Sequence, residues 1–170
     1  MKIFDRWIRR LEWEARGVKV WKPCNIYRTA QLGKGVSVGM FSEVGDGVVI
    51  GDWTRIGMGV FIPKGTTIGS NCFIAPKVCF VHDLMEWDVY PRDTEEHWKA
   101  TVVEDYVTIG ANAMIRPGVR IGSGALIGLG AVVTKDIGAG EVWYGNPAEY
   151  KRERFVYNIK GGEVYGTYNR

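Results

Sequence analysis

The sequence has few cysteines and no long apolar run, and each shortage excludes a class of protein. The three cysteines, Cys24, Cys72 and Cys79, form no C-x-x-C pair and leave one over, so we expect reduced thiols in a cytoplasmic protein. Charged residues such as Arg6 and Glu12 interrupt the amino-terminal segment, which therefore does not resemble a signal peptide. No stretch approaches the roughly 20 apolar residues that a membrane span requires.

The net charge and the number of histidines are also low. The 22 basic and 19 acidic residues leave a formal net charge of +3, without the dense basic patch that is typical of nucleic-acid binding. The only histidines are His82 and His97. A zinc site needs about three protein ligands, and the Cys and His spacing does not supply them. We therefore predict no nucleic-acid partner and no metal.

An aliphatic residue recurs every six positions along most of the chain. A small or β-branched residue follows four places after it, and the intervening turn usually begins with glycine. A period of six does not match the 3.6 residues of an amphipathic helix, but it matches a short strand followed by a tight turn. Three units close a triangular coil of 18 residues, so the pattern predicts an all-β, parallel β-helix of five to six coils. The inward positions are Val20, Ile26, Leu32, Val38, Val44, Ile50, Ile56, Ile62, Ile68, Ile74, Phe80, Val103, Ile109, Ile115, Ile121, Ile127 and Val133.

We expect one domain over residues 1–170, with the β-helix over 20–146. Residues 1–19 contain a predicted short helix (about 2–15) that caps the first coil; contact of this basic amphipathic helix with a membrane surface is the less favoured alternative. Residues 147–170 are predicted as a C-terminal helix, from Pro147 to about Val156, and a tail. For the tail, a hairpin and pairing with a neighbour are both open.

The repeat is interrupted once, by a loop over residues 81–102 that contains both histidines. Insertions in solenoids lie on one face, often the binding face. His82 stands two residues after the core residue Phe80, so the preceding strand anchors it, and a neutral imidazole can accept a proton from an attacking group. We predict His82 as a general base, with Asp83 or another loop carboxylate orienting it. His97 lies in mid-loop without such an anchor.

Arg92 follows Pro91 in the same loop. A planar guanidinium suits a phosphate or carboxylate group of a ligand. A salt bridge to the acidic residues of the loop is an equally good interpretation.

The hexads of residues 20–155 resemble those of the hexapeptide-repeat acyltransferase superfamily, which implies a left-handed parallel β-helix. Residues 74–83 (IAPKVCFVHD), followed by Pro91-Arg92 and Thr101, are similar to the sugar-nucleotide amino-sugar N-acetyltransferases. The blocks IGANA (109–113), GAVVTKD (130–136) and GNPA (145–148) are common in the superfamily. His82 is a departure, because the amino-sugar group usually has Asn there, whereas maltose and galactoside O-acetyltransferases have their catalytic histidine at that place.

The resemblance also implies ligands and an assembly. It places acetyl-CoA contacts at four residues, a basic residue near nucleotide phosphates at Arg152, and substrate contacts at three residues. Glu149 departs from a second basic residue that is often found near the phosphates. The family forms trimers with active sites between subunits, so we expect a homotrimer. The acetyl-CoA residues are Ala111, Leu129, Thr134 and Lys135, and the substrate residues are Asp83, Arg92 and Asp52.

The function predicted from the sequence is acetyl-CoA-dependent N-acetylation of the amino group of a nucleotide-linked amino sugar. The amine attacks the thioester directly, His82 accepts its proton, and backbone N–H groups hold the oxyanion. The first alternative is an O-acetyltransferase that acts on a sugar or glycan hydroxyl. A catalytically inert solenoid scaffold is a more distant alternative.

Overall fold

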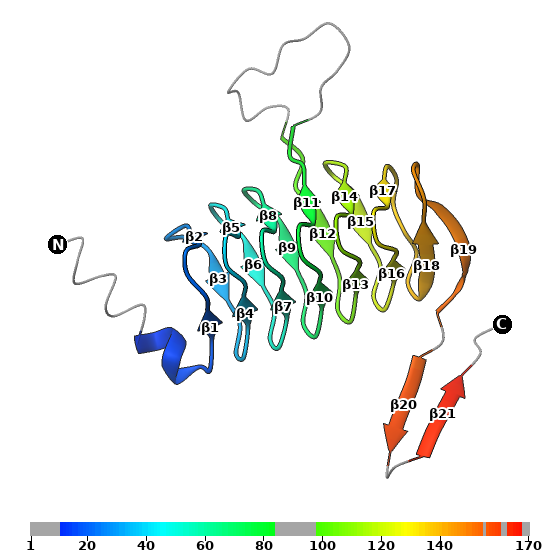
Figure 1. Cartoon of the computed structure of the whole chain (residues 1–170), viewed down its shortest axis with the longest axis horizontal. Coiled ribbons are helices and arrows are strands. Elements are labelled where there is room, and N and C mark those ends of the chain that lie inside the picture. The colour runs from blue at the N-terminus through cyan, green and yellow to red at the C-terminus, as the bar shows by residue number, and fades with distance from the viewer. Residues whose placement is uncertain (1–10, 84–97, 155, 161–162, 168–170) are drawn as a thin grey trace, which may run out of the picture.

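The chain folds as a parallel β-solenoid (Figure 1), seen in a computed structural model that describes residues 11–83, 98–154, 156–160 and 163–167. Each hexad forms a two-residue strand that ends on its aliphatic residue. All 17 inward positions close such a strand, which confirms the predicted β-helix. In chain order the strands are β1 (Lys19–Val20), β2 (Asn25–Ile26), β3 (Gln31–Leu32), β4 (Ser37–Val38), β5 (Glu43–Val44), β6 (Val49–Ile50), β7 (Arg55–Ile56), β8 (Phe61–Ile62), β9 (Thr67–Ile68), β10 (Phe73–Ile74), β11 (Cys79–Phe80), β12 (Val102–Val103), β13 (Thr108–Ile109), β14 (Met114–Ile115), β15 (Arg120–Ile121), β16 (Leu126–Ile127) and β17 (Val132–Val133).

Three sheets form the faces of the solenoid, because each strand pairs in parallel with the third strand along the chain. Sheet A has the order β1-β4-β7-β10-β13-β16 and continues into β18 (Glu141–Tyr144) and β19 (Glu149–Glu153). Sheet B is β2-β5-β8-β11-β14-β17, and sheet C is β3-β6-β9-β12-β15. We name the corners by the sheets they join: the A/B corner includes residues 40–41, 111–112 and 129–130, the B/C corner 64–65, 117–118 and 134–135, and the C/A corner 34–35, 52–53 and 105–106.

The interior is filled by stacked equivalents of the hexad. Ile62, Ile74 and Ile115 are completely buried, as are many of their equivalents. Ser42 and Thr54 occupy small inward positions, and their hydroxyls donate to the carbonyls of Gly57 (2.9 Å) and Gly69 (2.6 Å). These two hydroxyls therefore enter the core with hydrogen-bond partners, whereas the equivalent buried hydroxyl of Thr66 has none among the described residues.

The glycine at the start of a turn is required by the closeness of the next coil. A Cβ atom on Gly39 would stand 2.6 Å from the backbone of Gly57 and Met58. Gly35, two residues further into its own turn, has φ +66° instead, a conformation that glycine adopts without steric cost. The repeat thus uses glycine for two different reasons at two positions.

The insertion leaves the stack intact. Thr67 of β9 pairs with Val102 of β12 as it would without the loop. Lys34 and Asp52 occupy equivalent turns of successive coils and are 18 positions apart. Ser70 and Asp105 form the same contact across the insertion and are 35 positions apart. The extra residues leave and re-enter the solenoid at the B/C corner (Figure 1).

The predicted C-terminal helix is wrong. Residues 149–153 form β19, which pairs antiparallel with β18, and Tyr150 packs edge-on against Trp143 with ring centroids 6.4 Å apart. The last parallel strand of sheet A offers unpaired backbone groups, and pairing with this edge outweighs a weak local preference for helix. Beyond it, β20 (Val156–Lys160) and β21 (Glu163–Thr167) form the hairpin that was one alternative for the tail.

The amino-terminal helix is seen in its last turn. Residues 11–15 are helical, and Trp13 packs against the core, so this part of the chain lies at the first coil as a cap would. The rest of the predicted helix falls outside the described residues. In the described part of the chain, no helix has both the length and the apolar character needed to span a membrane.

Candidate functional site

The base of the insertion is a short two-stranded neck at the B/C corner. The backbone N–H of Val81 donates to the carbonyl of Ile115 in the next coil (3.0 Å). Asp83 forms an antiparallel bridge with Trp98, and the N–H of Lys99 donates to the carbonyl of His82 (3.2 Å). The backbone of His82 is therefore held from the solenoid side and from the returning strand.

The His82 ring is half-buried between two aromatic side chains. The Trp98 ring lies edge-on to it, with centroids 4.7 Å apart, and the Phe61 ring of the preceding coil is 6.3 Å away. The Lys64 ammonium lies over the other end of this cluster, 5.7 Å from the Trp98 ring centroid. Within the described residues the imidazole has these aromatic neighbours and no hydrogen bond, so the orienting role of Asp83 stays a prediction.

The B/C corner brings part of the predicted acetyl-CoA site to His82. The sheet B strands β8, β11, β14 and β17 are consecutive neighbours, and the turns that follow them contain Lys64, His82, Arg116 and Thr134-Lys135 in that order. Since neighbouring strands are about 4.8 Å apart, residues 134–135 lie roughly 10 Å along the axis from His82.

The other two predicted acetyl-CoA residues lie at the A/B corner. Gly130 donates its N–H to the carbonyl of Ala111 (2.8 Å), which stacks this turn on the one before it. The Leu129 side chain is 81% exposed. The four residues are thus divided between the two edges of sheet B. Ala111 and Leu129 lie on one edge, and Thr134 and Lys135 on the other.

Asp52 lies at the C/A corner, a different corner from His82. Its Oδ1 accepts the backbone N–H of Lys34 in the preceding coil (2.7 Å), and Asp105, at the equivalent position, does the same for Ser70 (2.7 Å). Within one chain, therefore, the Asp52 carboxylate binds a backbone N–H group of the preceding coil. The fold of a single chain does not bring Asp52 close to the insertion.

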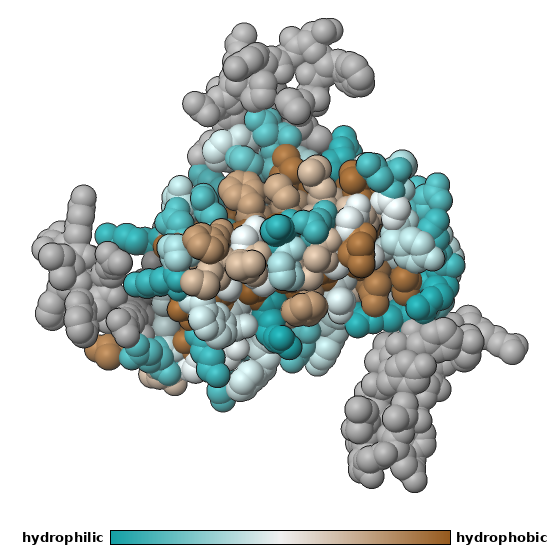
Figure 2. All heavy atoms as spheres, viewed as in Figure 1, coloured by the Kyte–Doolittle hydropathy of each residue, from teal (hydrophilic) through white to brown (hydrophobic). Residues whose placement is uncertain are grey.

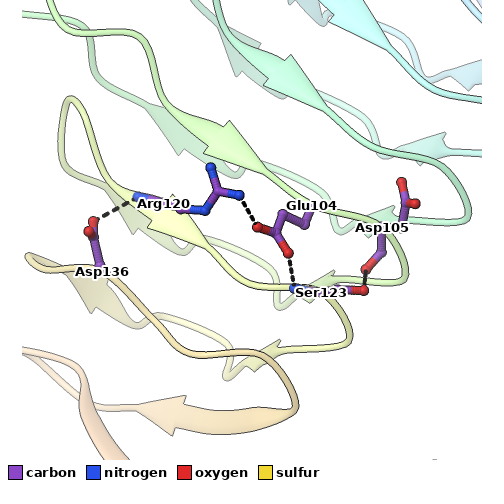
Figure 3. A network of polar contacts seen from close by, with 5 residues as sticks. All are labelled: Glu104, Asp105, Arg120, Ser123 and Asp136. Carbon is purple, nitrogen blue, oxygen red and sulfur yellow. Dashed lines mark hydrogen bonds and ion pairs between the residues drawn. The ribbon is translucent and has the colours of Figure 1, made fainter.

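Figure 3 shows how this polar stack continues along the solenoid. Glu104 accepts the backbone N–H of Ser123 (2.8 Å) and forms an ion pair with Arg120. The Ser123 hydroxyl donates to the carbonyl of Asp105 (3.0 Å), and Asp136 accepts the N–H of Arg120 (2.8 Å). These groups connect successive coils.

The remaining predicted residues are separate from the neck. Arg152 lies on β19, where it pairs with Val142 and donates to the carbonyl of Glu153 (3.0 Å). Arg92 lies outside the described residues. In the described ranges no three His, Cys, Asp or Glu side chains are grouped as metal ligands.

Two functional or anchoring residues were missed by sequence reasoning. Trp98 returns to the neck from 16 positions beyond His82, and no periodicity connects them. Arg154 donates to the carbonyls of Tyr106 (3.1 Å) and Gly124 (3.0 Å) and to the Thr108 hydroxyl (3.0 Å), while burial lowers the pKa of its guanidinium. Residues 149–154 (EYKRER) show no alternation of apolar and polar residues, so the sequence contained no signal for a strand there.

Exposed large apolar side chains occur at several places on the surface, including Trp53 and Tyr106 at the C/A corner. Figure 2 shows apolar side chains gathered over the middle of one face of the solenoid, with hydrophilic ones around them. At the A/B corner, Met40, Phe41, Met58 and Leu129 are exposed, and on sheet B, Met114 is exposed as well. Large exposed apolar patches are typical of interaction surfaces.

Comparison with known families identifies the repeat. The family model described as "Bacterial transferase hexapeptide (six repeats)" matches residues 29–64 and 100–135. Residues 29–64 and 100–135, which make up less than half of the chain, are therefore similar to bacterial transferase hexapeptide repeats. The two matched segments lie on either side of the loop that contains His82, so the insertion is the part of the solenoid that departs from the repeat.

A curated relative matches a short part of this hexapeptide-repeat chain. It is the 2,3,4,5-tetrahydropyridine-2,6-dicarboxylate N-acetyltransferase of Staphylococcus aureus (strain JH9), 54% identical over 48 residues, which are 28% of this chain and 20% of the relative. The match therefore spans about one fifth of the length of that relative.

Solved structures share the fold over most of the chain. A variant of perosamine N-acetyltransferase from Caulobacter crescentus, in complex with CoA and GDP-perosamine, aligns with a TM-score of 0.67 and 22% identity over 88% of this chain and 66% of its own. AntD, an N-acyltransferase from Bacillus cereus in complex with dTDP and 3-hydroxybutyryl-CoA, aligns with a TM-score of 0.72 and 19% identity over 85% and 88%.

Proposed function

We propose that the protein is an acetyl-CoA-dependent N-acetyltransferase that acts on the amino group of a nucleotide-linked amino sugar. The observation that carries the proposal is the anchored His82 at a corner that it shares with Thr134 and Lys135, two predicted acetyl-CoA residues. The names of the structural neighbours support the same chemistry, since one is an N-acetyltransferase in complex with CoA and GDP-perosamine.

The proposed reaction is a direct transfer in a ternary complex. The amine nitrogen attacks the thioester carbonyl, a C–N bond forms, and the C–S bond then breaks to release the CoA thiolate. His82 accepts a proton from the acceptor nitrogen, either from the ammonium before attack or from the nitrogen of the tetrahedral intermediate after it. Lys64, Arg116 and Lys135 belong to turns of the same corner, where the Lys64 and Lys135 ammonium groups lie over the Trp98 and Trp143 rings, 5.7 and 5.2 Å from the ring centroids. Their positive charge suits the phosphates of CoA or of a nucleotide.

The division of the acetyl-CoA residues supports a homotrimer with active sites between subunits. Ala111 and Leu129 lie on one edge of sheet B, and Thr134 and Lys135 on the other, so a long ligand is best bound where one chain's corner meets a second chain. The exposed apolar side chains of the A/B corner are suited to such a contact. In this proposal Asp83, Arg92 and Asp52 contact the acceptor, with Asp52 acting across an interface, and Arg152 binds nucleotide phosphates on the cofactor side.

Release of the CoA thiol tests the proposal. The protein is incubated with acetyl-CoA and one class of acceptor at a time. The acceptors are nucleotide-linked amino sugars, free amino sugars and neutral sugars. We expect turnover with the nucleotide-linked amines and an acetamide product by mass spectrometry. Turnover with hydroxyl acceptors alone, giving an ester product, overturns the proposal.

The O-acetyltransferase alternative rests on one observation, the histidine at position 82. A hydroxyl is a weaker nucleophile than an amine and depends more on a general base. The acceptor panel separates the two reactions, because alkaline hydroxylamine cleaves the acetyl ester of the isolated product and leaves an acetamide intact.

A further inference from the structure

We propose that Trp98 is a positioning residue that fixes the orientation of the His82 imidazole. The inference deepens the proposed function, since it concerns the proposed base. Trp98 lies on the returning strand of the neck, opposite Asp83 and beside His82. Its ring is 4.7 Å from the imidazole, with an interplanar angle of 65°.

The imidazole is held from two directions that are independent in the sequence. Phe61 projects from sheet B in the preceding coil, with its ring centroid 6.3 Å away. Trp98 approaches from the loop side, after the excursion of the chain. An edge-on aromatic pair favours one ring orientation several-fold over the alternatives.

Lys64 completes the arrangement by holding Trp98. Its ammonium lies 5.7 Å from the Trp98 ring centroid, within the range of a cation–π contact. Phe61 begins β8, and Lys64 belongs to the turn after β8. The same coil therefore supplies Phe61, which contacts His82, and Lys64, which contacts Trp98. The rigid solenoid thereby sets the geometry of a side chain at the start of a long insertion.

The chain contains a matched control for this cluster. At the C/A corner, the Lys34 ammonium lies over the Trp53 ring at the same distance, 5.7 Å. Trp53 packs on the turn at Gly35 and belongs to a different corner from the insertion. Replacing Trp53 therefore removes a lysine-supported tryptophan without touching His82.

The first test is independent of any activity. The full chain has two histidines, so their ring signals are resolved by NMR of histidine-labelled protein and assigned with His82→Ala. We expect Trp98→Leu to shift the His82 ring signals by loss of the indole ring current, and Trp98→Phe to shift them less. Trp53→Leu should leave them in place. Equal spectra for Trp98→Leu and the unsubstituted protein, with both folded by circular dichroism, overturn the proposal.

The second test separates positioning from general stability. With acetyl-CoA and the active acceptor, Trp98→Leu should lower kcat about threefold to tenfold, with KM changed by no more than about twofold. Trp98→Phe should restore most of kcat. In a His82→Ala background, Trp98→Leu should cause no further loss; a full additional loss there overturns the positioning role. If the unsubstituted protein turns over no acceptor, the proposed function fails, while the NMR result still decides whether the Trp98 ring packs against His82.

Discussion

The C/A and B/C corners are built from the same hexad but use their side chains differently. At the C/A corner, carboxylates such as Asp52 and Asp105 accept backbone N–H groups of the preceding coil. At the B/C corner the chain departs into the insertion, and His82 meets aromatic rings instead. The continuous corner thus commits its carboxylates to coil stacking, whereas the interrupted corner packs its imidazole against aromatic rings and leaves it without a hydrogen bond among the described residues.

The largest expected difference between the corners is in catalysis. His82→Ala should lower kcat/KM by about 10²–10⁴-fold, the range for removal of a general base, when thiol release is followed with the active acceptor. Asp105→Ala at the C/A corner is the control and should leave kcat/KM unchanged. If the two variants have equal kcat/KM, His82 is not the base.

The next largest effect concerns the strand that closes sheet A. Arg154→Met should lower the free energy of unfolding by about 3 kcal/mol, because several carbonyls lose a charged donor at a partly buried site. Arg152→Met, on the exposed part of β19, should change it by less than about 0.5 kcal/mol. Urea denaturation measures both. Equal destabilisation would mean that Arg154 does not anchor β19.

A smaller effect sharpens the role of Asp52. Asp52→Ala and Asp105→Ala should each lower the free energy of unfolding by about 1 kcal/mol, since each removes one acceptor from a backbone N–H. The proposed acceptor role predicts that only Asp52→Ala also raises the KM for the acceptor. Steady-state kinetics with both variants decides; identical KM values confine Asp52 to the structural stack.

The smallest expected effect is on thiol reactivity. Burial raises the pKa of Cys79, on the outer face of sheet B, and also that of Cys72 inside the coil. Because the thiolate is the reactive form, alkylation by iodoacetamide at pH 8 should be slower for both than for N-acetylcysteine, and should rise with pH. Peptide mass spectrometry gives the rate at each site. A rate for Cys79 equal to that of the free thiol contradicts this.

The candidate site was predictable only in part. His82 follows a core strand by two residues, so its anchoring was visible in the hexad register. Trp98 was not, because its approach depends on how a long insertion returns to the corner. Asp52 was predicted as a ligand-binding residue, yet its partner in one chain is a backbone group one coil away, which a linear pattern does not reveal.

The sequence by itself determined the β-helix, the number of its hexads and the place of its interruption, because inward burial every sixth residue is a local, periodic demand. Only the tertiary structure decided the rest. It turned residues 149–153 into a strand, since an open sheet edge outweighs weak local propensity. It divided the predicted acetyl-CoA residues between two corners and set Trp98 against His82, because contacts between coils depend on three-dimensional register and not on spacing along the chain.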